Sequence, residues 1–213
     1  ILSKLSSLKH NCINPVVDIT NYLMLEQGQP LHAFDADLLD NLVGRKVIVN
    51  DFGIRVGKAG ESFKALDNNE YKLNANVSLI TCDDIPIAIA GIIGGKNSSV
   101  SEKTQRIWLE AAVFTPTSIR KSCREIGLRT DASSRYEKGI SANMTIAVAK
   151  RACDLISLEL GGFVKSIHVN SGFKKKSIFI KLRKQKINNV LGKLKNNDNS
   201  LNAVRYLGET EIE

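Results

Sequence analysis

The 213-residue chain is poor in the residues that build disulfide-stapled or metal-bound folds. Its 4 cysteines stand far apart without a CxxC pair, and its 3 histidines are too few and too scattered to complete a zinc site of the usual spacing. No apolar run approaches the roughly 18 residues of a membrane span, and no secretion signal opens the chain. We therefore expect reduced thiols, no metal site and no membrane contact, in a cytoplasmic protein.

The common catalytic and ligand-binding motifs are also missing. The sequence has no phosphate-binding P-loop, no HExxH, no GxSxG and no EF-hand loop, so the corresponding enzyme and calcium-binding classes have no support. A hydrophobic content of 43% and a charged content of 24% are typical of a folded globular protein. The chain opens with Ile-Leu-Ser-Lys and stops without an obvious domain end, so we expect a piece of a longer protein.

The positive charge of the chain is concentrated near its end. The formal net charge is +8, and residues 164–196 hold ten lysines and arginines and no acidic residue, which leaves the remainder close to neutral. Such a block attracts phosphate backbones, but it is also typical of a solvated linker. Charge alone leaves both interpretations open.

Hydrophobic spacing and turn residues predict an α+β fold with a β-rich, layered core of mixed or antiparallel sheets. Helices are predicted at 14–26, 116–126 and 141–160, each with a capping or proline start and a glycine end. Strands are predicted at 46–49, 77–81, 85–90 and 106–110, with a hairpin turn at 68–69. Residues 129–135 read as a polar loop. We expect one domain over 1–165, then a basic linker and a truncated small module over 166–213, with a strand at 177–182 and a helix at 184–194.

Several polar residues are candidates for a site, and each has an ordinary structural alternative. Strand alternation places Glu110 on one face with Trp108, so a carboxylate stands among apolar neighbours; it is either an internal ion pair or a functional group. His32 is either a packed or solvated histidine or a site residue. The glycines of 91–96 form either a plain turn or a cradle for an anion. The polar side chains of the 129–137 segment serve either local loop and capping bonds or function: Asp131, Arg135 and Glu137.

Ordered sequence blocks over about 150 residues resemble one family. They are NPVVDITNY at 14–22, GQPLHAFD at 28–35, AIAGIIGG at 88–95, LEAA at 109–112, GLRTDAS at 127–133 and RYEKG at 135–139. Together they are similar to the central B3/B4 region of bacterial phenylalanine-tRNA ligase beta subunits, and the tail resembles the start of the following B5 domain.

The resemblance implies an editing site that hydrolyses tyrosine wrongly esterified to the phenylalanine tRNA. A pocket built for phenylalanine rejects an analogue with an added hydroxyl only about a hundredfold, so a second site is needed. By the resemblance, Glu110 reads the phenol, and His32 holds the attacking water. Gly94, Thr130 and Ala132 match the small residues that line the pocket, where they leave room for the ring.

The resemblance also implies partners and leaves one alternative open. The family's enzyme pairs beta with alpha subunits in an alpha2-beta2 assembly, acts on tRNA(Phe), and uses ATP and Mg²⁺ through parts outside this chain, which needs no cofactor of its own. Family members often carry an arginine where this chain has Asn11, and residues 40–53 read as a surface loop insertion. The alternative is therefore a non-catalytic scaffold or RNA-binding module in which editing has decayed.

Overall fold

The structure is a computed structural model that describes residues 2–8, 12–170, 183, 186 and 189–190. The chain divides into two units, residues 1–168 and 169–213, and the first is described below. Asn11, the strand predicted at 177–182 and most of the helix predicted at 184–194 lie outside the described residues. The boundary near residue 165 and the B5-like module stay predictions.

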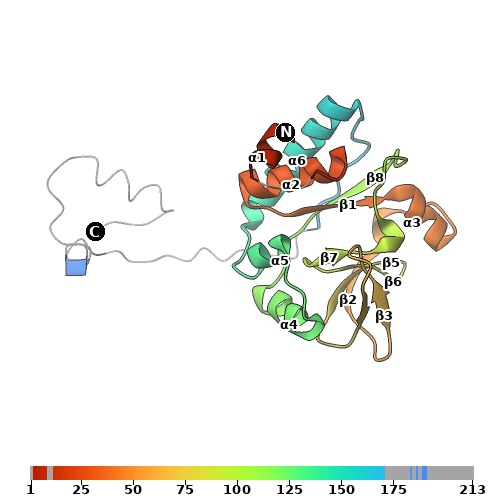
Figure 1. Cartoon of the computed structure of the whole chain (residues 1–213), viewed down its shortest axis with the longest axis horizontal. Coiled ribbons are helices and arrows are strands. Elements are labelled where there is room, and N and C mark those ends of the chain that lie inside the picture. Colours follow the sequence, from red (N-terminus) through yellow and green to blue (C-terminus); the bar gives the residue numbers. More distant parts are fainter. Residues whose placement is uncertain (1, 9–11, 171–182, 184–185, 187–188, 191–213) are drawn as a thin grey trace. The chain divides into compact units, whose positions relative to one another are not determined.

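The fold is α+β, with antiparallel sheets and packed helices (Figure 1). The described helices are α1 (Leu2–Ser7), α2 (Pro15–Gln27), α3 (Ala36–Val43), α4 (Pro116–Ile126), α5 (Asp131–Tyr136) and α6 (Ala142–Leu160). The predicted ends of α2 are confirmed: the Asn14 side chain accepts a hydrogen bond from the Val17 amide, and Gly28 ends the helix in the left-handed region at φ 73°. The helices predicted at 116–126 and 141–160 are confirmed as well.

Three antiparallel sheets are formed by the described strands. A two-stranded pair contains β1 (Leu31–Asp35) and β8 (Ile107–Ala111). A four-stranded sheet has the order β2-β5-β6-β7, from β2 (Phe52–Val56), β5 (Ser78–Cys82), β6 (Ile85–Ile89) and β7 (Ile93–Gly94). The third sheet is the hairpin of β3 (Ser62–Lys64) and β4 (Glu70–Lys72), whose turn contains the predicted Asn68 and Asn69.

The β1–β8 pair lies between a helical layer and the four-stranded sheet (Figure 1). On one face, Leu31 and Leu109 pack against the buried side chains of α2 and α6. On the other face, Phe34 and Trp108 pack into a cluster with residues of the four-stranded sheet. The pair is therefore covered on both faces, and a polar side chain that points toward the four-stranded sheet is at least partly buried.

The strand predicted at 46–49 is wrong. Helix α3 runs to Val43, a 3-10 turn covers Val49–Asp51, and β2 begins at Phe52. Residues 44–50 are exposed apart from Val47, and the interpretation of 40–53 as a surface insertion stays a prediction. The physical reason is a local polar anchor: the Asp40 carboxylate accepts a hydrogen bond from the Val47 amide at 2.8 Å, which turns the chain. Val47 is then buried with the core rather than paired in a sheet.

The polar stretch at 129–135 is also not a loop, because residues 131–136 form helix α5. Thr130 caps this helix by accepting from the Ser133 amide, and the Ser133 hydroxyl accepts from the Thr130 amide in return. This reciprocal capping marks the start of a helix, although the polar composition of the stretch favours a loop.

Candidate functional site

His32 and Glu110 are direct cross-strand partners in the β1–β8 pair. Directly opposed residues of an antiparallel pair project from the same face, so both side chains lie on the side that faces the four-stranded sheet. Glu110 shares that side with Trp108, as the alternation predicted, while Leu109 packs on the helices. Two residues far apart in the sequence are therefore brought to one place, each half-buried.

The Glu110 carboxylate has no ion pair and no hydrogen bond to any described residue. The ion-pair interpretation of this residue is therefore wrong. Every fully buried side-chain nitrogen or oxygen within the described ranges has a hydrogen-bond partner, so the unpaired carboxylate must keep access to solvent. Burial raises the pKa of the Glu110 carboxyl to about 7, because desolvation disfavours its charged form. The result is an accessible acceptor in largely apolar surroundings.

The imidazole of His32 is held between an aromatic ring and a glycine. Its ring meets Phe34 edge-on with centroids 4.6 Å apart. A Cβ atom added to Gly94 would lie 2.5 Å from His32 Cε1 and 2.6 Å from Nε2, so the absence of a side chain at Gly94 makes room for the imidazole. Burial lowers the pKa of His32 to about 4, so the ring is neutral near pH 7 and its nitrogens are able to accept a hydrogen bond.

Gly94 also joins the site to the β3–β4 hairpin. The Leu66 amide donates to the Gly94 carbonyl at 3.1 Å, and Leu66 Cδ1 would lie 3.0 Å from a Cβ at Gly94. Leu66 and His32 thus contact the same glycine from different elements. The hairpin is part of the surroundings of the imidazole, which the sequence did not predict.

Thr130 and Ala132, the other predicted lining residues, hold helix α5 to the core. The Thr130 hydroxyl donates to the Ile92 carbonyl at 2.9 Å, next to β7, and caps α5. Ala132 packs beside the core cluster that includes Ile92. The contacts of Thr130 tie it to the segment that carries Gly94, and a role in binding the substrate ring stays a prediction for both residues.

A buried polar network that sequence analysis missed lies beside Glu110. Gln29 donates to the carbonyls of Pro30 and Ala112 and accepts from the Thr145 hydroxyl, and Tyr136 donates to the Pro30 carbonyl at 3.1 Å. Burial and then the nearby Glu110 charge hold the pKa of Tyr136 well above its ordinary value. The network joins the end of α2 to β8, α5 and α6. In the sequence, the network is marked only by a glutamine between Gly28 and Pro30, and a single residue in a turn gives no hydrophobic spacing from which its burial could be predicted.

The remaining polar candidates of the 129–137 segment make local bonds. Arg135 donates to the Asp131 carbonyl at 2.8 Å and pairs with its carboxylate at 3.5 Å. Arg129 pairs with Glu137 at 3.1 Å. These contacts lie within α5 or next to it, as the structural alternative for these side chains predicted.

No metal-binding group and no membrane helix is found in the described part of the chain. Nowhere there do three or more His, Cys, Asp or Glu side chains gather closely enough to hold a metal ion. None of its helices is both long and apolar enough to cross a membrane.

Comparison with known proteins identifies the family. The sequence profile described as the B3/4 domain matches residues 1–161. The chain belongs to the B3/4 domain family. This B3/4 domain is 73% identical to the phenylalanine-tRNA ligase beta subunit of Prochlorococcus marinus strain NATL2A over 218 residues, which cover 100% of the chain and 26% of the relative.

More distant relatives have the same description. The phenylalanine-tRNA ligase beta subunit of Prochlorococcus marinus strain MIT 9313 is 48% identical over 94% of the chain and 24% of the relative. That of Synechococcus sp. strain CC9605 is 42% identical over 95% of the chain and 25% of the relative. The predicted resemblance is confirmed, and the chain spans about a quarter of the length of the curated relatives it matches.

Proposed function

We propose that this B3/4 domain hydrolyses tyrosyl-tRNA(Phe), as the editing part of a phenylalanine-tRNA ligase beta subunit. The observation that carries the proposal is the register of β1 and β8, which sets His32 opposite Glu110 on one face. The unpaired carboxylate and the neutral imidazole supply a phenol acceptor and a water acceptor side by side. Similarity to beta subunits of the ligase supports the same assignment.

Glu110 distinguishes tyrosine from phenylalanine through its unsatisfied acceptor. A tyrosyl phenol donates to the carboxylate, and a hydrogen bond to a charged acceptor contributes about 1.5–3 kcal/mol. A phenylalanyl ring displaces water from the carboxylate without replacing that bond, which costs roughly 1–3 kcal/mol or more. The editing site therefore favours tyrosine over phenylalanine, whereas an apolar pocket for aminoacylation favours phenylalanine.

His32 orients the attacking water. Because its pKa of about 4 lies far below neutrality, the ring is not a strong base at pH 7, and full proton abstraction is not its main role. A neutral ring nitrogen accepts a hydrogen bond from water and directs the oxygen lone pair toward the ester carbonyl. An aminoacyl ester is labile, so positioning alone gives a useful rate.

The proposal places the domain in a larger enzyme. The partners are tRNA(Phe) and the alpha subunit of an alpha2-beta2 synthetase, located in the cytoplasm where tRNA is charged. ATP and Mg²⁺ serve aminoacylation elsewhere in that enzyme, and ester hydrolysis by water requires neither.

Deacylation of tyrosyl-tRNA(Phe) by the purified chain tests the proposal. The double variant Glu110→Ala/His32→Ala is expected to lose at least a hundredfold in rate, because it removes both the acceptor and the water-holding group. Glu102→Ala/His168→Ala is the matched control, since both of its residues are exposed and neither belongs to β1 or β8. If the native chain deacylates no faster than the Glu110/His32 variant, the domain is a scaffold with decayed editing.

A further inference from the structure

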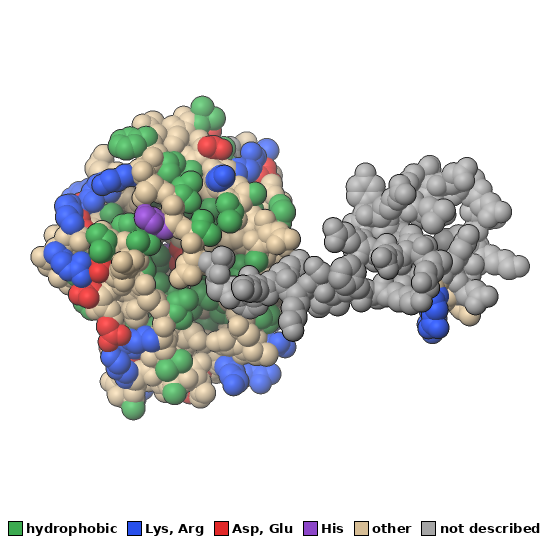
Figure 2. All heavy atoms as spheres, turned by 180° about the vertical axis from the view of Figure 1, so that it is seen from behind, with side chains coloured by type: hydrophobic (Ala, Val, Ile, Leu, Met, Phe, Trp, Pro, Cys, Tyr) green, Lys and Arg blue, Asp and Glu red, His purple; other side chains and the backbone are tan. Residues whose placement is uncertain are grey.

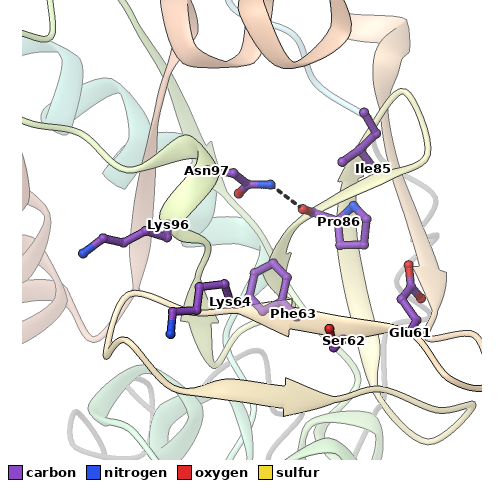
Figure 3. Close-up of a pocket in the computed structure, with 8 residues that line it drawn as sticks. All are labelled: Glu61, Ser62, Phe63, Lys64, Ile85, Pro86, Lys96 and Asn97. Atoms are coloured by element: carbon purple, nitrogen blue, oxygen red, sulfur yellow. Dashed lines mark hydrogen bonds between the residues drawn. The ribbon is translucent and has the colours of Figure 1, made fainter.

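A groove lies between the β3–β4 hairpin, β6 and the short 3-10 turn η2 (Lys96–Ser98) (Figure 3). Its cavity volume is about 450 Å³. It is lined by Glu61, Ser62, Phe63, Lys64, Ile85, Pro86, Lys96 and Asn97. The half-buried Ile85 and Pro86 give it an apolar wall above the buried Phe63, and its rim is polar and charged, a combination that suits a ligand with a flat ring and a charged group.

Two lysines of the groove converge on one residue. Lys96 donates to the Asn68 side-chain oxygen at 2.8 Å, and Lys64 donates to the Asn68 carbonyl at 2.5 Å. Figure 3 shows Lys64 and Lys96 extending toward the same side of the groove, away from Glu61. An ammonium group has three donors, so each lysine keeps two for a ligand. Neither lysine has a carboxylate partner among the described residues.

The acidic residue of the groove does not cancel this charge. Glu61 accepts bidentate hydrogen bonds from Arg55 at 2.6 and 2.9 Å and a further one from the Lys58 amide. The Arg55 contacts hold the pKa of Glu61 below its ordinary value, so the carboxylate is ionised and already paired. Among the lining side chains, the charge without a paired partner is therefore that of Lys64 and Lys96, while Glu70, opposite Lys64 in the hairpin, accepts a hydrogen bond from Ser62 at 2.6 Å. Figure 2 shows Lys and Arg side chains in separate groups around the edge of the visible face, with Asp and Glu side chains next to several of them.

The lysines are connected to the His32 imidazole by two short segments. Residues 62–66 alternate between exposed and buried, which puts Lys64 and Leu66 on one exposed side of the hairpin, and Leu66 contacts Gly94 beneath His32. Lys96 follows Gly94 by two residues, and an isolated bridge pairs Ala65 with Gly95. Both lysines therefore belong to segments that contact or contain Gly94 and Gly95, next to the imidazole.

We infer that this groove binds the single-stranded 3′ end of a tRNA, with Lys64 and Lys96 on a backbone phosphate and Ile85 and Pro86 beside a base. The inference rests on the proposed editing function and adds the surface that delivers the esterified 3′ end to His32 and Glu110. Phosphate contacts position a nucleic acid without reading its sequence, which suits an end shared by all tRNAs. Asn68 holds the two ammonium groups together and thereby prepares the contact.

Binding of an uncharged, fluorescently labelled tRNA 3′-end minihelix to the full 213-residue chain tests the inference, by anisotropy over a range of salt concentrations. Lys64→Gln/Lys96→Gln is expected to weaken binding about tenfold near 0.1 M salt and to reduce the slope of log affinity against log salt by about 1.4, the value for two single-strand phosphate contacts. Lys121→Gln/Lys150→Gln is the matched control, because both lysines are exposed, do not line the groove and remove the same charge.

The outcomes separate the inference from the proposed function, because binding of uncharged RNA does not depend on hydrolysis. A loss confined to the Lys64/Lys96 variant supports the groove, and a parallel loss in subsaturating tyrosyl-tRNA deacylation shows that it delivers the substrate. Equal losses in both double variants, or no loss in either, overturn the inference even if deacylation proceeds. A specific binding loss without any deacylation in the native chain keeps the groove and removes the editing function.

Discussion

His32 and Glu110 stand directly opposite each other across two antiparallel strands, yet no hydrogen bond or ion pair joins their side chains. Burial lowers the pKa of the imidazole to about 4 and raises that of the carboxyl to about 7. Both groups are therefore neutral between these values. The pair differs from a structural salt bridge, which favours both charged forms, and it leaves each polar group available to a ligand.

The two groups are expected to have opposite effects on stability as the pH changes. The pKa of Glu110 is raised from 4.5 to about 7, so its contribution to folding is full below pH 4.5 and is lost as the pH rises through 7. The pKa of His32 is lowered from 6.5 to about 4, so its contribution is full above pH 6.5 and is lost as the pH falls through 4. Between these limits, the two effects largely cancel in the native chain.

Single variants should reveal this cancellation. Relative to Glu110→Gln, the native chain should lose about 1.4 kcal/mol of unfolding free energy per pH unit as the pH rises from 5 to 6.5. Relative to His32→Gln, it should gain a similar amount over the same interval. Urea denaturation at constant ionic strength measures both differences, and the other titrating groups cancel in each comparison. Differences that do not vary with pH would show that neither residue is desolvated.

The pH dependence of tyrosyl-tRNA deacylation should follow Glu110 rather than His32. An ionised carboxylate is the stronger acceptor for the phenol, so the rate with native protein should rise with pH through about 7 and level above it. The imidazole stays neutral through this range, so it adds no further rise or fall to the pH dependence of the rate. In Glu110→Gln the rise should disappear and the rate should fall about tenfold or more, in line with a lost charged hydrogen bond. A rise through pH 7 that survives this substitution would assign it to another group.

Gly94→Ala should disturb the imidazole with a modest effect on folding. The new Cβ would lie 2.5 Å from His32 Cε1, a contact that the ring must move to avoid. We expect at least a tenfold loss of deacylation, and an overpacking penalty of about 1–3 kcal/mol. Thermal unfolding and single-turnover deacylation measure the two effects.

Gly162→Ala is the control for this substitution, since nothing lies within 4 Å of a Cβ at that position. It should leave both quantities near their native values. Full activity in Gly94→Ala would show that the position of the imidazole is unimportant.

Gln29→Leu should be strongly destabilising because it removes the centre of the buried polar network. Gln29 is 1% exposed, and its loss leaves the Ala112 carbonyl without its side-chain donor and the Thr145 hydroxyl with only a 3.3 Å bond to the Ser141 carbonyl. Unsatisfied buried groups cost about 1–3 kcal/mol each, so we expect a total loss of roughly 2–5 kcal/mol in urea denaturation. Gln27→Leu is the control, because this neighbouring side chain is exposed and bonds only Glu26. Equal effects of the two substitutions would show that the network adds no stability.

Local signals in the sequence predicted those elements whose ends are set by neighbouring residues. Asn14 and Gly28 define α2, and Gly127 and Gly161 end α4 and α6, because capping and left-handed turns depend on a few adjacent residues. The same kind of capping signal does not predict a helix where the surrounding residues are mostly polar. Thr130 caps a helix in a stretch that reads as a loop.

The sequence by itself determined that Glu110 is a carboxylate among apolar side chains, since alternation along one strand is a local property. Only the tertiary structure decided that His32 is its partner, because antiparallel register between distant segments depends on the packing of both faces of the pair. The same holds for Gly94 beneath the imidazole and for Gln29 in the buried network, whose contacts join segments far apart in the chain. Long-range pairing is chosen by the burial of many side chains together, and no short stretch of sequence contains that information.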